Sequence, residues 1–382
     1  MNHRLSLSLD FIRLAAALLV LLHHFSYERF TGNFLSFIRQ LELGHDAVVI
    51  FFVLSGYVIC HAVSRTNKGF LDYMSRRLAR LYSVLLPAIF IVLFLDVLGT
   101  AVAHQVYDGK IANSHILMRG IINLLFLQEW QFFSIRFSSD GPLWSLGYEF
   151  WYYCIFGVFW FIDKPLYRYL LICTLAFFIG LKILLLMPIW WLGVVVYNQH
   201  KKQGSTLYSR RAVSLIGLVT PFIIYMMYKT SHLSQLSSDV SGFLLTYFFS
   251  DLNFNNSGLF INDIFVALLF AVSLYFLPAG LSHINFSVGR RVNAFIRKAA
   301  GATLTIYILH FPFLLFTYAS LSQFSAVTPL WLDSVALVLV ILCCYFISLF
   351  TEAKKQPYQI HIFAILDFAK CSLVRSANKR LR

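Results

Sequence analysis

The feature that most constrains this chain is its series of long apolar stretches. A membrane-spanning helix needs roughly 17 to 25 mainly apolar residues, and about ten stretches of the 382-residue chain meet that requirement. Only 13% of the residues are charged and 59% are hydrophobic, a balance that excludes an ordinary soluble domain. The sequence therefore predicts an all-α polytopic membrane protein. We place its spans near residues 9–27, 46–63, 81–103, 143–163, 166–184, 186–198, 211–229, 260–280, 300–320 and 330–351, the sixth being the shortest.

The charges between these stretches predict their orientation. Cytoplasmic loops are enriched in lysine and arginine. Residues 64–80 carry five basic side chains against one acid, and residues 199–211 and 281–298 carry four each with none. The alternate loops show no basic excess. Both termini are therefore predicted to be cytoplasmic, and the net charge of +14 is explained by topology and anionic lipid rather than by nucleic acid.

Two regions divide the chain. Residues 1–355 are expected to form one transmembrane domain, and residues 356–382 a basic cytoplasmic tail. This tail forms either a short helix on the inner membrane surface or a plain extension. The first apolar run is expected to stay as a span, because Arg13 interrupts it early and no small-residue cleavage site follows. The six cysteines form no CxxC pair, so neither a metal site nor a disulfide framework is predicted.

Ionisable residues inside the first span are the first functional candidates. Such side chains are costly at membrane depth and usually face a cavity or a partner. Arg13 and His24 are eleven residues apart, which on a helix means roughly 16 Å along the axis and nearly the same face. Each alone has a structural explanation, because an arginine near a helix end can extend to the interface and a terminal histidine can be hydrated.

The fourth span adds a carboxylate. It begins at Gly141 with the sequence GPLWSLGYE, and Glu149 is expected about 9 Å below its outer end, near the depth of His24. A carboxylate can orient an imidazole and raise its basicity, so this pair predicts either an acid/base site or a purely structural ion pair.

Three further features are candidates. Ser55 and Gly56 form a small pair that permits close approach of another helix or of a thin substrate. His310, beside a proline in mid-span, indicates a hydrogen bond between helices or a cavity lining. The basic cluster at the mouth of the third span can clamp a polyphosphate or contact lipid headgroups; it comprises Arg76, Arg77 and Arg80.

Taken together, these segments resemble the acyltransferase-3 family of integral-membrane O-acyltransferases, which modify sugars of bacterial surface glycans. Five segments carry the resemblance in family order: Leu9 to Phe25, Phe51 to Tyr57, Arg77 to Tyr82, Trp144 to Glu149, and Thr303 to Pro312. The chain departs from the family at Val49, where an aspartate is frequent, and at Ser83, where a proline is common. No fused extracytoplasmic hydrolase-like domain is expected.

The resemblance implies an enzyme of the bacterial inner membrane that moves an acyl group, most commonly acetyl, from acyl-CoA to a carbohydrate hydroxyl. It implies that His24 is catalytic, with Arg13 as an essential companion and Glu149 as a site carboxylate. It also implies that the arginine cluster, Arg77 and Arg80 above all, contacts coenzyme A.

Within this reading, Ser55, Gly56, Trp144, Ser145 and His310 are expected along the substrate path. Acyl-CoA, a glycan acceptor and membrane lipids are the expected partners, with no permanently bound cofactor. The sequence leaves open whether His24 acts as a general base or as a covalent acyl carrier.

A transporter or flippase of a polar or lipid-linked solute is the main alternative, because it would also place ionisable residues inside helices. A purely structural membrane component would leave the cost of Arg13, His24 and Glu149 without a reason.

Overall fold

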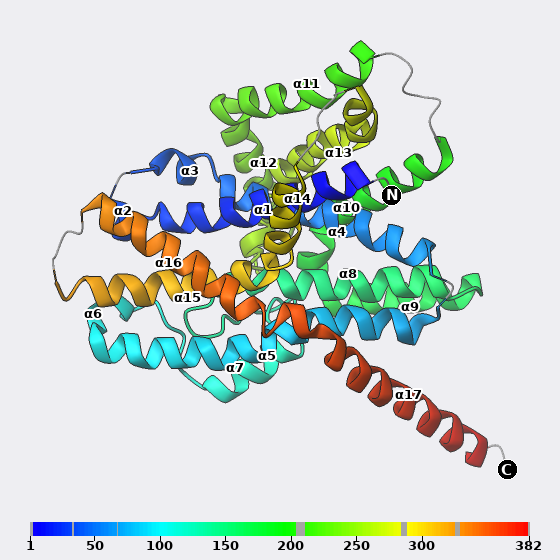
Figure 1. Cartoon of the computed structure of the whole chain (residues 1–382). Coiled ribbons are helices and arrows are strands. Elements are labelled where there is room, and N and C mark those ends of the chain that lie inside the picture. Colours follow the sequence, from blue (N-terminus) through cyan, green and yellow to red (C-terminus); the bar gives the residue numbers. More distant parts are fainter. Residues whose placement is uncertain are drawn as a thin grey trace.

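The computed structural model describes residues 3–32, 34–66, 68–203, 211–283, 289–324 and 329–380, with side chains described as far as residue 372. Within these residues the chain is helical, with two isolated β-bridges, and the long helices lie side by side in one bundle (Figure 1). The main helices are α1 (His3–Phe25), α4 (Leu43–Ser64), α5 (Phe70–Val102), α8 (Trp144–Phe161), α9 (Pro165–Ile179), α10 (Leu181–Gln203), α11 (Arg211–Thr230), α12 (His232–Phe248), α13 (Phe260–His283), α14 (Arg290–Ala300), α15 (Thr303–Leu321), α16 (Leu330–Ser348) and α17 (Lys355–Arg380). Shorter helices are α2 (Glu28–Thr31), α3 (Ser36–Gln40), α6 (His104–Tyr107) and α7 (Ile116–Leu124), with one-turn 3-10 helices at Asn255–Ser257 and Glu352–Lys354.

Each of the ten predicted spans overlaps mainly with one long helix, and the all-α polytopic class is confirmed. Among the described residues, eight helical segments are long and apolar enough to cross a membrane. The two predicted spans outside this group are α8, which carries Glu149, and α9, which has 15 residues. Helices suit an apolar solvent because every backbone donor and acceptor between their ends is paired within the helix. The inside or outside position of the termini stays a prediction.

Two boundaries differ from the sequence prediction. The third span was expected to begin at residue 81, but α5 begins at Phe70, because arginine-rich turns are good helix formers although they are not apolar. The sixth span was expected to be the shortest, but α10 has 23 residues and α9 is the short one. Gly180 causes this, because its φ of +80° ends α9 earlier than hydropathy indicates.

Close backbone contact joins α4 to α10 in the middle of the bundle. A Cβ atom on Gly56 would lie 2.0 Å from the carbonyl oxygen of Trp190, and one on Gly193 would lie 1.9 Å from that of Val53. Both helices therefore depend on glycine at their crossing. Helix α4 also packs against α1 and α13, which makes it central to the fold.

Several helices were not predicted from hydropathy. Helix α12 lies in what was expected to be an outer loop, and its first turn is capped by Ser231, whose Oγ accepts from the Leu233 N–H (3.3 Å). Helix α17 forms much of the predicted tail region and extends away from the bundle at its C-terminal end (Figure 1). Its position on the membrane surface stays a prediction.

Candidate active site

Arg13 and His24, which were predicted to share a face of α1, both contact helix α15. Arg13 Nη2 donates to Thr303 Oγ1 (3.1 Å), and the His24 Nδ1 atom lies 3.1 Å from His310 Nε2. Arg13 Nη1 also lies 3.9 Å from Asp10. The predicted common face is confirmed, since both side chains contact the same neighbouring helix.

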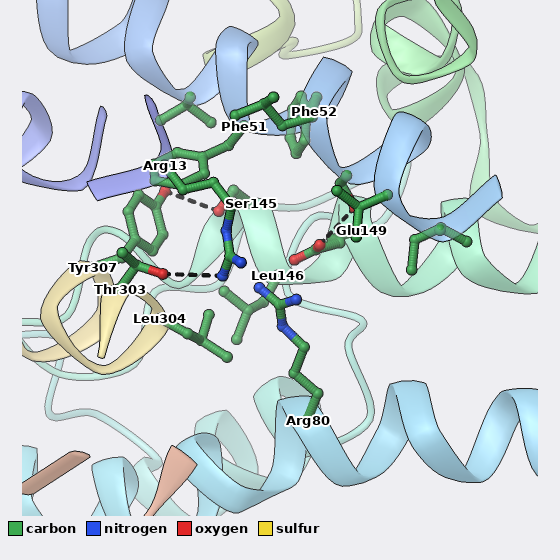
Figure 2. Close-up of a pocket in the computed structure, with 15 residues that line it drawn as sticks. Arg13, Phe51, Phe52, Arg80, Ser145, Leu146, Glu149, Thr303, Leu304 and Tyr307 are labelled. Atoms are coloured by element: carbon green, nitrogen blue, oxygen red, sulfur yellow. Dashed lines mark hydrogen bonds between the residues drawn. The ribbon is translucent and has the colours of Figure 1, made fainter. Parts of the chain in front are cut away.

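Arg13 lines a narrow cavity of about 60 Å³, which we call the arginine cavity. Figure 2 shows the guanidinium groups of Arg13 and Arg80 pointing toward one another and toward Glu149. The polar lining residues are Arg13, Ser55, Arg80, Ser145, Glu149, Thr303 and Tyr307; the rest of the wall is mainly aliphatic and phenylalanine side chains.

The predicted arginine cluster separates into two groups. Arg76 does not line the arginine cavity. Its Nε and Nη2 donate to Asp72 on the same helix (2.8 and 3.2 Å). Arg80 lines the arginine cavity, and Arg77 lies 6.0 Å from the ring centre of Tyr153. Within the part of the chain that the structure describes, the buried Nε atoms of Arg77 and Arg80 have no hydrogen-bond partner. Two inward arginines with unused donors are suited to an anionic ligand.

Glu352 lies in the short 3-10 helix between α16 and α17 and has a definite position beside α15. Its carboxylate accepts from the backbone N–H groups of Leu304 and Thr305 (3.2 and 3.4 Å) at the start of α15. A negative charge there pairs with otherwise unsatisfied donors and with the helix dipole. Its charge also acts on Arg13 and Arg80. Glu352 therefore anchors the helix end beside the arginine cavity.

His24 lines a second and larger cavity of about 410 Å³, which we call the histidine cavity. Other lining residues include His45, Asn123, Gln128, Glu129, Asp140 and Trp144. The two cavities adjoin, because Val48 and Tyr307 line both of them. Sequence reasoning named neither residue, although Tyr307 lies within the late histidine segment.

The hydrogen bonds define the tautomer of the neutral histidine pair. His310 Nδ1 donates to the carbonyl oxygen of Ile306 (3.0 Å), which leaves its Nε2 as an acceptor. His24 Nδ1 lies 3.0 Å from the carbonyl oxygen of Val20 and 3.1 Å from His310 Nε2, so this nitrogen carries the proton. The His24 Nε2 lone pair has no partner among the described residues, and its side chain lines the histidine cavity.

The pairing of His24 with Glu149 that the sequence predicted is wrong. Glu149 instead accepts from Ser55 Oγ (2.8 Å) and from the Tyr153 hydroxyl, and it lines the arginine cavity. The prediction assumed that the fourth span starts at the membrane surface. The segment before α8 is buried, with Ser139 and Asp140 fully covered, so α8 begins inside the bundle and carries Glu149 deeper.

The other path candidates have different positions. Ser145 Oγ donates to the Tyr307 hydroxyl (2.8 Å) beside the arginine cavity, whereas Trp144 lines the histidine cavity. Gly56 lines neither cavity and instead contacts α10, so helix packing is the use that the structure gives it. Among the described residues, no group of three or more His, Cys, Asp and Glu side chains could hold a metal ion.

Two loop acids of the histidine cavity were not identified from the sequence. Burial and the neighbouring Asp96 raise the pKa of Asp140 well above its ordinary value, although Arg136 and the Leu143 backbone N–H act in the opposite direction. Burial also raises the pKa of Glu129, against the hydrogen bond from Ser134. Residues 104–142 hold three acidic and three basic residues, so the charge of this loop did not single out either acid.

Comparison with known proteins identifies the family. The model of the acyltransferase-3 family, described as an acyltransferase domain, matches residues 6–349, so the chain belongs to that family. It is 31% identical over 163 residues to the O-acetyl transferase of Shigella phage Sf6, covering 39% of this chain and 44% of that protein. It is 30% identical over 174 residues to YrhL of Bacillus subtilis (strain 168), provisionally named a peptidoglycan O-acetyltransferase, covering 41% of this chain and 24% of that protein. The aligned part thus spans less than half the length of either relative, and no solved structure matches the chain.

Proposed function

We propose that the protein is a membrane O-acyltransferase that moves an acyl group, in the simplest case acetyl, from acyl-CoA to a carbohydrate hydroxyl. Membership of the acyltransferase-3 family supports the reaction class. The names of both relatives support acetyl as the transferred group, and the peptidoglycan in the name of the Bacillus relative supports a glycan as the acceptor.

The observation that carries the proposal is the junction of two unlike cavities. One contains arginines and the other contains a histidine with a free ring nitrogen, and they meet at Tyr307. A donor with phosphates and a long thin arm matches the first cavity, and a polyhydroxyl acceptor matches the second. A reaction at the junction needs both substrates at once, which is the requirement of direct acyl transfer.

His24 is the general base in the proposed mechanism. Its Nε2 takes the proton of the acceptor hydroxyl as that oxygen attacks the thioester carbonyl carbon. The carbon–sulfur bond then breaks, and the coenzyme A sulfur leaves as the thiol after taking the proton from His24. His310 positions the base, because its Nε2 accepts from His24 Nδ1 and stabilises the imidazolium that forms.

Arg77 and Arg80 bind donor phosphates in this proposal, because their Nε donors have no partner within the described chain. Arg13 lines the arginine cavity together with Arg80, and there it can bind the pantetheine arm or the developing oxyanion. The orientation that the loop charges predict would put this arginine end toward the cytoplasm, where acyl-CoA is made.

The test uses membranes that contain the full chain, with radiolabelled acetyl-CoA. His24→Ala should insert normally and lose label transfer to glycan by at least about 100-fold. His104→Ala makes the same change at an exposed site on α6 and should keep full transfer. Equal transfer by wild type and His24→Ala would refute the mechanism. Movement of a solute across the membrane without glycan labelling would favour the transporter alternative. Fractionation should find the protein in the bacterial inner membrane.

A further inference from the structure

Asp140 is a buried carboxyl group for which the described residues provide no hydrogen-bond partner. It lies in the segment before α8, its exposure is 0%, and it lines the histidine cavity. Neither of its oxygens accepts a hydrogen bond from any described residue, although the Leu143 N–H lies close enough to favour its charged form. Burying such a group costs free energy, so its retention points to a partner that enters the cavity.

The backbone around Asp140 is held firmly. Asp96 of α5 accepts from Ser138 Oγ (2.6 Å) and from both the N–H and Oγ of Ser139 (3.0 and 2.7 Å). Ser138 has a φ of +49°, a conformation that costs energy for a residue other than glycine. The Asp140 N–H donates to the Phe137 carbonyl oxygen (2.9 Å). Hydrogen bonds and a strained backbone therefore hold this loop in place, although its Asp140 carboxyl group stays unpaired among the described residues.

Two amides on the same cavity repeat this pattern. The Asn123 NH₂ group donates to the carbonyl oxygens of Arg119 and Ile135 (2.9 and 3.1 Å), and the Gln128 NH₂ group donates to that of Leu143 (2.8 Å). Because these carbonyls need donors, the orientation of both amides is fixed. The oxygens Oδ1 of Asn123 and Oε1 of Gln128 are left buried and unpaired.

Among the described residues, the four buried side-chain atoms that line the histidine cavity without a partner are all oxygens, of Asn123, Gln128 and Asp140. Of the other charged side chains on this cavity, Arg136 donates to the Lys110 carbonyl oxygen (2.7 Å) and Glu129 Oε2 lies 3.5 Å from Lys182 Nζ, while Glu42 adds a further carboxylate to the lining. The indole of Trp144 adds an apolar wall of the kind that packs on a sugar ring. A ligand that complements this set brings several hydrogen-bond donors and no acid.

We propose that Asp140, Asn123 and Gln128 form a specificity subsite for a sugar that presents hydroxyl or amino donors and carries no carboxylate or phosphate on that face. This inference rests on the proposed function for the reaction itself. Asp140 is the central residue, because its carboxyl group contributes two of the four unpaired oxygens, and in its charged form it accepts the strongest hydrogen bonds from such donors.

The test is competition for His24-dependent labelling of endogenous glycan in membranes that contain the full chain. The probes are methyl glucoside, methyl glucosaminide and methyl glucuronate at equal concentration. We expect inhibition by the first two and at least tenfold weaker inhibition by the glucuronate. Comparing the strength of inhibition by the glucoside with that by the glucosaminide shows whether the subsite prefers a hydroxyl or an amino donor. Equal inhibition by the glucuronate, or no inhibition by any of the three, would overturn the proposal.

A matched pair of variants tests the residue. Asp140→Asn should weaken inhibition by methyl glucoside tenfold to a hundredfold and leave the KM for acetyl-CoA unchanged. Asp239→Asn makes the same change on an exposed face of α12 and should alter neither value. Unchanged inhibition in Asp140→Asn would overturn the inference while the labelling itself still supports the transferase. Absence of any His24-dependent labelling would instead refute the proposed function, and the wild-type probe series needs no variant to fold.

Discussion

Replacing Gly193 by alanine tests the packing that holds the site together. The new Cβ would lie 1.9 Å from the carbonyl oxygen of Val53 and 2.6 Å from the N atom of Tyr57, both backbone atoms that cannot rotate away. Ordinary contact begins near 3.4 Å, so α4 and α10 must separate by about 1.5 Å. Such overpacking costs about 1–3 kcal/mol, and the better helix propensity of alanine returns about 1 kcal/mol at most.

Because both clashing atoms belong to the backbone, we take the upper end of that cost and expect a net loss of about 2 kcal/mol for Gly193→Ala, seen as a fall of a few degrees in Tm. Activity should fall further, because α4 also carries Ser55, whose hydroxyl donates to Glu149 in the arginine cavity. A displacement near 1 Å in a reacting site can reduce the rate by about 100-fold.

Gly242→Ala is the matched control. Gly242 also lies inside a helix, α12, but a Cβ there would meet no atom within 4 Å. Alanine should leave Tm unchanged or raise it slightly, with full activity. Thermal unfolding of the purified protein in detergent, followed by tryptophan fluorescence, measures both variants. Equal Tm changes in the two variants would refute the close-contact argument.

Four further outcomes are expected. Arg77→Ala should raise the KM for acetyl-CoA at least about tenfold, whereas Arg76→Ala should change it less than about twofold; steady-state kinetics would contradict this if the two variants behaved alike. His310→Ala should lower kcat by about 10- to 100-fold with the acetyl-CoA KM unchanged, and a changed KM with normal kcat would contradict a positioning role. Asp96→Ala should raise the acceptor KM without affecting the donor KM, since it releases the loop that holds Asp140; parallel changes in both would argue for general misfolding. Burial raises the pKa of Asp140, so its charged form is gained only above the ordinary carboxyl range; the acceptor KM should therefore fall as pH rises through that pKa, and Asp140→Asn should remove this dependence.

The sequence was sufficient for the ten apolar helices of the predicted spans and for the residues of the first span. Apolar length predicted where helices occur, because the membrane requires it, and helical spacing predicted that Arg13 and His24 share a face. Both predictions depend on one segment at a time. The structure agrees with both predictions because local geometry alone determines them.

Depth and direction across segments were not predictable in the same way. Glu149 was expected beside His24, because a span was assumed to start where its apolar run starts. The loop around Ser139 is buried, so α8 begins inside the bundle. The apolar pattern of the sequence does not predict a loop that enters the bundle. Similarly, hydropathy does not tell an arginine that pairs with its own helix, such as Arg76, from one that turns inward, such as Arg77.

Helix α15 explains how the two cavities are joined. Thr303, Tyr307 and His310 are separated by four and three residues, so they lie along one face of the helix. In that order Thr303 bonds to Arg13, Tyr307 lines both cavities, and His310 bonds to His24. A rigid helix keeps these three contacts at fixed spacing, while the Glu352 carboxylate fixes its first turn. On the proposed mechanism, an acyl group that passes from the arginine cavity to the histidine base must therefore pass Tyr307, and the hydroxyl of Ser145 holds that side chain in place.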